Sequence, residues 1–286
     1  PQCSARASAS GFYKTSEPEP TMLIDIGANL SSQRFDCDIA EVLQHAQNAN
    51  IEKIVITGTS MSESQAAIDR CTTHNADFPD MLYATAGIHP HSADQFNPKS
   101  TSISLRRLAA HPSVVAIGET GLDFFRNLAA PDVQQRSFEA HLELAIDLEM
   151  PLFLHERDAA TRQLEILKAH RDQFHSAVIH CFTSDRKTLY QYLDLDLHIG
   201  ITGWVCDERR GLDLQKIIAD IPLNRLMVET DSPYLLPRNM AFSPKNNRNE
   251  PAFLPWVVAG IAAHRTESEA QIIAQTGATA RQFFKI

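Results

Sequence analysis

The sequence predicts an α/β protein with the architecture of a closed (β/α)8 TIM barrel. Three observations support this prediction: a length of 286 residues, eight short apolar runs, and helical patterns between the runs. Single α/β barrels commonly have this length. Eight strands that alternate with helices favour closure into a barrel over an open sheet.

The predicted strands are nearly continuous runs of Val, Ile and Leu, as is typical of parallel strands that are covered on both faces. Their starts are mostly about 25 to 35 residues apart, which fits a repeated βα unit. The runs are LIDI (23–26), KIVITG (53–58), LYATAG (82–87), VVAIG (114–118), PLFLH (151–155), AVIHC (177–181), LHIGI (197–201) and RLMVE (225–229).

Helical patterns lie between these runs. Ile39, Val42, Leu43 and Ala46 form a stripe with i, i+3, i+4, i+7 spacing, which indicates an amphipathic helix. Other helices are predicted from residues that favour helix starts. These are Ser60 with Glu63, Asp132, Asp185, and Asn249 to Pro251 before one C-terminal helix.

Residues 1–21 contain no apolar periodicity and are rich in Ser, Ala, Pro and Glu. A secretory signal would require an apolar segment, and none is present there. We therefore predict a disordered leader over 1–21 and one barrel domain over 22–286.

Composition narrows the class of protein further. The net charge of −9 argues against a broad basic face, although bound cations would still allow a nucleic-acid substrate. The five cysteines are odd in number and form no C-x-x-C motif, which favours reduced thiols in a cytoplasmic protein. No apolar run is long enough to span a membrane.

Four side chains of metal-ligand type each occur where an apolar run ends. They are Glu119, His155, His180 and Asp231. Carboxylates and imidazoles suit Mg²⁺, Mn²⁺ and Zn²⁺. Taken alone, a Glu at this place is more often a solvated loop carboxylate or a helix cap, and a lone strand-end His is more often a hydrogen-bonded core residue. The carboxyl ends of parallel strands meet at one face, so the four together predict a hydrolytic centre with one or two divalent ions.

The residue types suggest separate roles within this centre. Glu119 can bridge two cations, and His155 and His180 can converge because neighbouring strands lie about 4.8 Å apart. Asp231 can ligate a metal and also accept a proton from water as general base. Glu229, in the same segment as Asp231, is expected to point elsewhere. Asp231 and Glu119 are the predicted catalytic residues.

Further side chains near the strand ends could contact a substrate. His89 and His91 flank a proline and can contact phosphate or help to hold metal. Arg157, Arg209 and Arg248 could bind the phosphate oxygens of a phosphodiester. Aromatic rings could stack on bases, although at least half of them are expected to be packing residues: Phe124, Phe125, Trp204 and Tyr234.

From about residue 22 to the last residue, the sequence resembles the TatD family of metal-dependent deoxyribonucleases, within the amidohydrolase-like superfamily. The matching motifs are ITGTS (56–60), AGIHPH (86–91), AIGETGLDF (116–124), HERDA (155–159), HCFT (180–183), IGITGWVCDERRG (199–211), ETDSPYLLPR (229–238) and RNEPAFLP (248–255). The resemblance implies 3′→5′ exonuclease activity on single-stranded DNA, and possible activity on RNA, with Mg²⁺ and a role in DNA repair. It also implies that Glu119, His155 and His180 are metal ligands, that Asp231 is the catalytic aspartate, and that His89 is a site histidine. We further predict a monomer.

The sequence departs from many members of this family at two places. Gly27 and Asn29 stand where those members carry two histidines on the first strand, as in the DIG-x-N branch of the family. Losing two ligands should weaken one metal position and favour exchangeable Mg²⁺ over tightly held Zn²⁺, with Mn²⁺ as another candidate. Glu156 stands where many members have Cys, and its role is open.

Two other functions fit the same residues. The same centre could hydrolyse an ester or amide, for example in D-aminoacyl-tRNA. A binding protein on a degenerate barrel would lack metal-dependent hydrolysis altogether.

Overall fold

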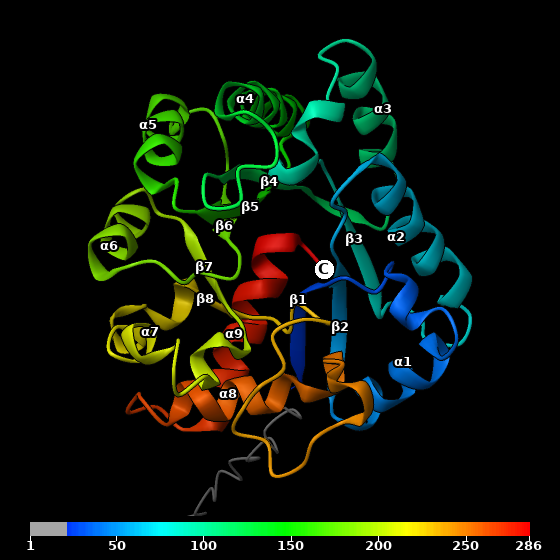
Figure 1. Ribbon diagram of the computed structural model, residues 1–286. Helices are drawn as coiled ribbons and strands as arrows, with labels where there is room; N and C mark the ends of the chain where they lie inside the picture. Colours follow the sequence, from blue (N-terminus) through cyan, green and yellow to red (C-terminus); the bar gives the residue numbers. More distant parts are fainter. Residues whose placement is uncertain (1–21) are drawn as a thin grey trace, which may run out of the picture.

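A computed structural model describes residues 22–286, and these residues form a ring of parallel strands surrounded by helices (Figure 1). The predicted leader, residues 1–21, lies outside the described residues. All eight predicted strands are present. They are β1 (Leu23–Ala28), β2 (Ile51–Ile56), β3 (Leu82–Ala86), β4 (Val114–Asp123), β5 (Leu152–Arg157), β6 (Ala177–Ile179), β7 (His198–Ile201) and β8 (Leu226–Val228).

The strands follow one another around the sheet in chain order, and each is parallel to the next. The last and first strands are joined by backbone hydrogen bonds at their carboxyl ends. The Asp231 amide donates to the Gly27 carbonyl at 2.8 Å, and the Asn29 amide donates to the Ser232 carbonyl at 2.7 Å. These bonds connect the two edges of the sheet, and the prediction of a (β/α)8 barrel is confirmed.

The outer layer contains the helices predicted near Ile39, Ser60, Asp132, Asp185 and Pro251, together with three others. They are α1 (Ile39–Asn48), α2 (Met61–His74), α3 (Ser100–Ala109), α4 (Pro131–Leu148), α5 (Ala160–His170), α6 (Arg186–Asp194), α7 (Leu212–Gln215) and α8 (Leu254–Ala262). Two predicted caps are confirmed: the Ser60 side chain accepts from the Glu63 amide, and the Asp185 side chain accepts from the Thr188 amide. Asp132 lies in the first turn of α4 but makes no capping hydrogen bond.

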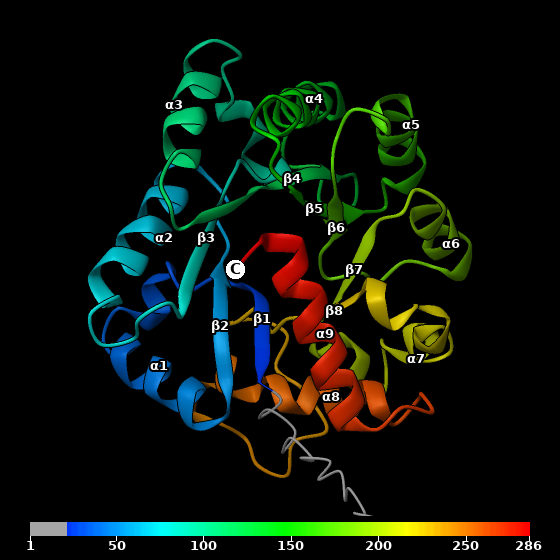
Figure 2. The same ribbon diagram turned by 180° about the vertical axis from the view of Figure 1, so that it is seen from behind.

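The C-terminal region contains two helices, so the prediction of a single one was wrong. After α8, Ser268 and Gln271 form a capping box that starts α9 (Glu269–Phe284). Helix α9 lies across one end of the barrel (Figure 2). There Phe283 and Phe284 pack with buried barrel residues such as Phe153 and Met227. This helix therefore covers the amino-terminal end of the barrel.

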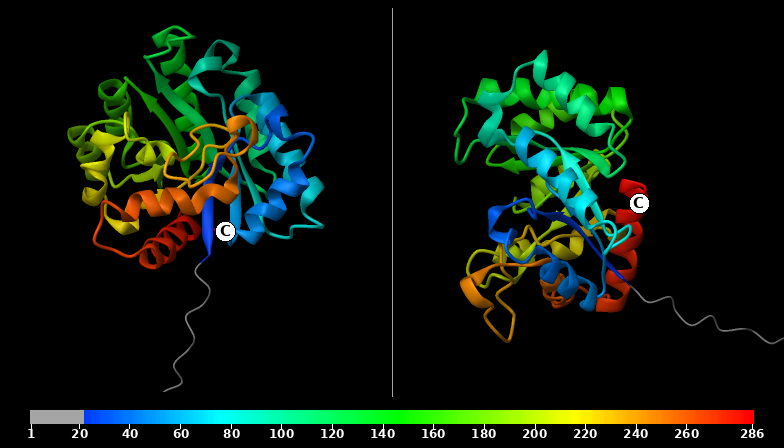
Figure 3. Two further views of the ribbon diagram at one scale, coloured as in Figure 1. Left: turned by 60° about the horizontal axis from the view of Figure 1, so that its bottom comes forward. Right: turned by 90° about the vertical axis from the view of Figure 1, so that its right-hand side faces the viewer.

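The opposite end of the barrel carries the loops that follow the strands. The long connection between β8 and α8 lies at this end, away from α9 (Figure 3). Asn249 is buried in this connection, and its side-chain amide donates to the carbonyls of Thr230 and Tyr234 at 2.9 and 2.7 Å. These bonds secure the loop beside the carboxyl end of β8.

Strand β4 is longer than predicted. It continues to Asp123, so Glu119 lies inside the strand and not at its end. The register between β4 and β5 shifts between Ile117 and Thr120, which is where Glu119 lies. Irregularities of this kind redirect side chains and are common beside active sites.

Within residues 22–286, no helix combines the length and the apolar character needed to cross a membrane. Four cysteines lie in this part of the chain, and none of them forms a disulfide bond: Cys37, Cys71, Cys181 and Cys206.

Candidate metal centre

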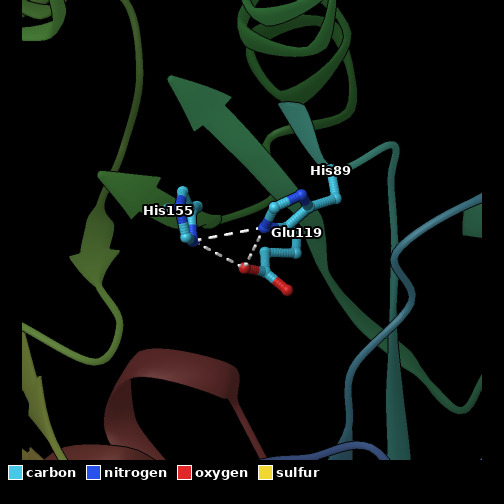
Figure 4. A group of neighbouring side chains, drawn as sticks. All are labelled: His89, Glu119 and His155. Atoms are coloured by element: carbon cyan, nitrogen blue, oxygen red, sulfur yellow. Dashed lines mark hydrogen bonds and ion pairs between the residues drawn. The ribbon is translucent and has the colours of Figure 1, made fainter. Parts of the chain in front are cut away.

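One carboxylate oxygen lies at the centre of the site. Oε1 of Glu119 is 2.7 Å from Nε2 of His180, 3.0 Å from Nδ1 of His155 and 3.2 Å from Nε2 of His89. Nε2 of His89 is also 3.3 Å from Nδ1 of His155. Figure 4 shows the two rings and the carboxylate pointing toward one another. These donors converge as the ligands of a cation would.

Barrel topology explains why distant residues meet here. His155 belongs to β5, His180 directly follows β6, and His89 lies in the loop after β3. Asp231 follows β8 and lines the same cavity, where its Oδ1 accepts a hydrogen bond of 2.8 Å from the side-chain amide of Asn29. The residues predicted as metal ligands are therefore brought to one cavity.

Burial and charge shift the pKa values of these groups. Burial raises the pKa of Glu119, but His180 and His89 outweigh it and hold that pKa well below its usual value. Burial lowers the pKa of His180, but Glu119 and Glu229 raise it well above its usual value. For His155, hydrogen bonds to Asp123 and Glu119 overcome the effect of burial, and its pKa is raised. Without a cation, protons on these rings balance the carboxylate.

Two other groups shift mainly because they are buried. Burial lowers the pKa of His89 to about 4, so this ring is neutral at pH 7. Burial raises the pKa of Asp231 to about 7. A neutral imidazole is a metal ligand, and a carboxylate with a pKa near 7 is suited to proton transfer.

Asp123 belongs to the site, although the sequence analysis did not assign it a role. Its Oδ2 is 2.6 Å from Nε2 of His91 and 3.3 Å from Nε2 of His155. It therefore orients the His155 ring from the side opposite Glu119. Asp123 is four residues beyond Glu119 on β4, and alternation along an extended strand was the pattern that could have indicated it.

Glu229 also belongs to the site, so the expectation that it points elsewhere was wrong. Its Oε2 is 3.4 Å from Nδ1 of His180, and its Oε1 accepts a hydrogen bond of 2.5 Å from the Cys181 amide. Asp231 has a φ of 52°, so the extended geometry of β8 does not continue through it and strand alternation does not fix the direction of Glu229 relative to Asp231.

Two glycines make room for Glu229. A Cβ atom on Gly27 would lie 2.3 Å from Oε2 of Glu229, and one on Gly200 would lie 2.8 Å from its Oε1. A side chain at position 27 and the Glu229 carboxylate would therefore compete for one space. Nδ1 of His180 and Oε2 of Glu229 are both buried and have no hydrogen-bond partner among the described residues.

A cavity of about 810 Å³ opens above the centre. Arg157 lines it as predicted, together with His89 and His91, whereas Arg209 and Arg248 are not among its lining residues. Arg248 instead pairs with Asp38 at 2.6 Å and with Glu250 at 2.7 Å. Arg126 and Arg210 also line the cavity.

The structure also gives places to the residues whose roles the sequence left open. Phe124 packs against the core, and Phe125 and Tyr234 line the cavity. Trp204 lines the cavity and also packs against the core. Glu156 is buried, and its carboxylate accepts from the Ala159 amide and from the Ser184 hydroxyl, both at 2.8 Å. Glu156 thus joins the start of α5 to the loop after β6.

Residues 24–285 match the protein family described as TatD related DNase. This chain belongs to that family. Among curated relatives, the 3′-5′ ssDNA/RNA exonuclease TatD of Rahnella sp. (strain Y9602) is 47% identical over 92% of this chain and 98% of that protein. The protein of the same name from Klebsiella pneumoniae (strain 342) is 46% identical over the same shares. The crystal structure of a TatD homologue from Escherichia coli K12 superposes with a TM-score of 0.82 at 25% identity, covering 92% of this chain and 98% of that one.

TatD proteins are metal-dependent, and the residues of this chain fit a cation. The ligand atoms of His89, Glu119 and His155 all lie within 4.8 Å of one another. Without a cation, His155 and His180 carry protons that balance the charge of Glu119. A divalent cation could replace those protons. Glu229 faces Nδ1 of His180, on the side of that ring away from Glu119, and would orient the ring toward a bound cation. The donor set therefore accepts the metal chemically.

Proposed function

We propose that this chain is a metal-dependent 3′→5′ exonuclease that hydrolyses terminal phosphodiester bonds of single-stranded DNA and RNA. The observation that carries the proposal is the contact of Glu119 Oε1 with three imidazole nitrogens at 2.7, 3.0 and 3.2 Å beside Asp231. The names of relatives at 43–47% identity support the substrate and the direction of digestion.

We assign one or two divalent cations, preferably Mg²⁺, to Glu119, His155, His180 and Asp231. A cation held by these residues would polarise the phosphoryl oxygen and lower the pKa of a bound water. Asp123, which is hydrogen-bonded to His91, holds His155 from its other side. The missing pair of histidines at positions 27 and 29 leaves fewer nitrogen ligands, which favours Mg²⁺ or Mn²⁺ over Zn²⁺.

Asp231 accepts the proton of the attacking water. Asn29 orients its carboxylate through a hydrogen bond of 2.8 Å. Arg157 and His91 line the cavity and bind the non-bridging oxygens of the substrate phosphate. Contacts to phosphate carry no sequence information, so little sequence preference is expected.

The test is digestion of a single-stranded oligonucleotide labelled at its 5′ end, with Mg²⁺ or with EDTA. A ladder of shortening products that retain the label is expected with Mg²⁺ alone. A phosphorothioate at the 3′-terminal linkage should block it, whereas one at the 5′-terminal linkage should not. Absence of any metal-dependent product would contradict the proposal.

The same preparation should be assayed on D-aminoacyl-tRNA. Release of the amino acid without nucleotide release would favour ester hydrolysis, and inactivity on both substrates would favour a binding protein. A cytoplasmic location, a monomeric state and a role in DNA repair stay predictions.

A further inference from the structure

Two arginine–aromatic pairs border the cavity. The guanidinium carbon of Arg157 lies 3.9 Å from the centroid of the Phe125 ring, and that of Arg210 lies 4.4 Å from the Trp204 ring. All four residues line the cavity. Each pair therefore presents an aromatic surface beside a positive charge.

The two pairs come from different parts of the barrel. Phe125 follows β4 and Arg157 ends β5, whereas Trp204 and Arg210 follow β7. Strand β6 lies between β5 and β7, and His180 directly follows it. Around the barrel, the two pairs therefore flank the position of His180.

The first pair is open to a ligand. Phe125 is 59% exposed, whereas its neighbour Phe124 packs against the core. Within residues 22–286, the Arg157 guanidinium forms no ion pair with a carboxylate, and it lies over the Phe125 ring. Its donors are free for a phosphate oxygen.

The second pair is built more rigidly. Nε of Arg210 is 2.9 Å from Oδ2 of Asp207, a buried carboxylate that also accepts from the Arg209 and Arg210 amides. The Trp204 indole donates to the Arg210 carbonyl at 3.2 Å. These bonds hold the guanidinium and the ring together before any ligand arrives.

We propose that the pairs form two nucleotide subsites, one for the base on each side of the scissile phosphodiester. This inference rests on the proposed exonuclease activity. In each subsite the ring stacks on one base while the guanidinium faces the adjoining phosphate. Stacking tolerates every base but needs an unpaired one, so the subsites account for a preference for single strands over duplex ends.

The central test combines Phe125→Ala and Trp204→Ala with substrates that lack one base. Each variant should lower kcat/KM on an intact oligonucleotide by about 5- to 150-fold, the range for losing one stacked base. On a substrate with an abasic residue at the 3′-terminal position, one variant should be as active as wild type. On a substrate with the abasic residue at the second position, the other variant should be as active as wild type. A purely structural defect would not depend on the position of the missing base.

Conservative and remote variants provide the controls. Phe125→Tyr and Trp204→Phe keep a stacking ring and should retain most of the activity. Tyr190→Ala removes an aromatic residue that is 47% exposed on α6 and is not among the lining residues of the cavity, so it should change nothing. If Trp204→Ala does not fold, Trp204→Phe and the wild-type protein on abasic substrates still measure the subsite.

Salt dependence tests the phosphate contact separately. Arg157→Gln should reduce the slope of log binding constant against log salt by about 0.7, the value for one phosphate of a single strand. Arg107→Gln, at an exposed position on α3, is the matched control. An unchanged slope for Arg157→Gln would remove Arg157 from the subsite.

Failure of the proposed function and failure of the two subsites would give different results. A wild-type protein that leaves single-stranded DNA intact overturns the proposed function. A wild-type protein that digests it, with Phe125→Ala and Trp204→Ala equally active or equally impaired on intact and abasic oligonucleotides, overturns the subsites alone.

Discussion

Nε2 of His180 lies 2.7 Å from Oε1 of Glu119, although 61 residues separate them in the chain. The contact joins the segment after β6 to the irregular middle of β4, across the position of β5. Both groups are buried, and each shifts the pKa of the other toward its charged form. This pair is the electrostatic centre of the site.

Glu119→Gln should abolish hydrolysis while the protein still folds. The substitution keeps the shape of the side chain but removes the charge that faces three imidazoles. Replacing a residue that only orients a metal ligand typically lowers metal affinity or activity by about 10- to 100-fold. Glu119 is itself a proposed ligand, so a loss of at least about 100-fold is expected. Assays of oligonucleotide digestion and of Mn²⁺ binding measure it. Glu143→Gln, exposed on α4, is the control, and full activity of Glu119→Gln would reject the assignment.

Metal binding should release protons near neutral pH. The pKa values of His155 and His180 are raised above 6.5 in the metal-free protein, and that of Asp231 is raised to about 7. A cation displaces these protons, so its apparent affinity should increase with pH. Calorimetric titration with Mn²⁺ at pH 7, in two buffers of different ionisation enthalpy, measures the release. Heat that does not depend on the buffer would contradict it, and His175→Ala, in an exposed loop, should behave like wild type.

Asp25→Asn should change how stability depends on pH. Burial raises the pKa of Asp25 from 3.8 to about 8, although hydrogen bonds from Thr230 oppose the shift. The folded state therefore retains a proton that the unfolded chain loses. Its stabilising effect is complete below pH 3.8, declines as pH rises, and is lost above about pH 8.

Over that range, the free energy of unfolding of wild type should fall by up to about 1.4 kcal/mol per pH unit relative to Asp25→Asn. The amide at position 25 can still accept from Gly27 and Thr230 but does not ionise. Urea denaturation in EDTA at several pH values gives the difference. If the free energies of unfolding of wild type and Asp25→Asn change in parallel with pH, Asp25 is already ionised at low pH. Asp194→Asn, at the exposed end of α6, serves as control.

Gly27→Ala should destabilise the protein through Glu229. The new methyl group would lie 2.3 Å from Oε2 of Glu229 and 3.0 Å from Cζ of Phe153. Overpacking of this kind typically costs about 1–3 kcal/mol. The cost should be smaller in the Glu229→Ala background, because the carboxylate is then absent. Equal costs in both backgrounds, measured by urea denaturation, would show that Glu229 does not occupy this space.

Local patterns were sufficient to predict the strands and several helix starts. Ser60 and Asp185 cap helices because a short polar side chain binds an amide three residues later. His155 and His180 were predictable as partners because each ends an apolar run and the two runs are neighbouring parallel strands. Helix α9 was missed because its packing surface is the end of the closed barrel, which exists only after folding.

Site residues in loops and irregular segments were harder to predict. Arg248 resembles a phosphate ligand in the sequence, but its ion pair with Asp38 joins residues 210 positions apart. Glu229 was assigned the wrong direction, because its place in the barrel interior depends on the space left by Gly27 and Gly200. The sequence pattern of one segment carries no information about the space that a distant segment leaves in the folded protein.

The amino-acid sequence alone determined the barrel, the order of its strands and four residues that meet at their carboxyl ends, since these follow from local hydrophobic patterns and parallel topology. Tertiary structure alone decided the directions of Glu119 and Glu229 and which arginines line the cavity. Those outcomes depend on a register shift, on close packing and on ion pairs between distant segments, and such contacts form only when the ring of strands has closed.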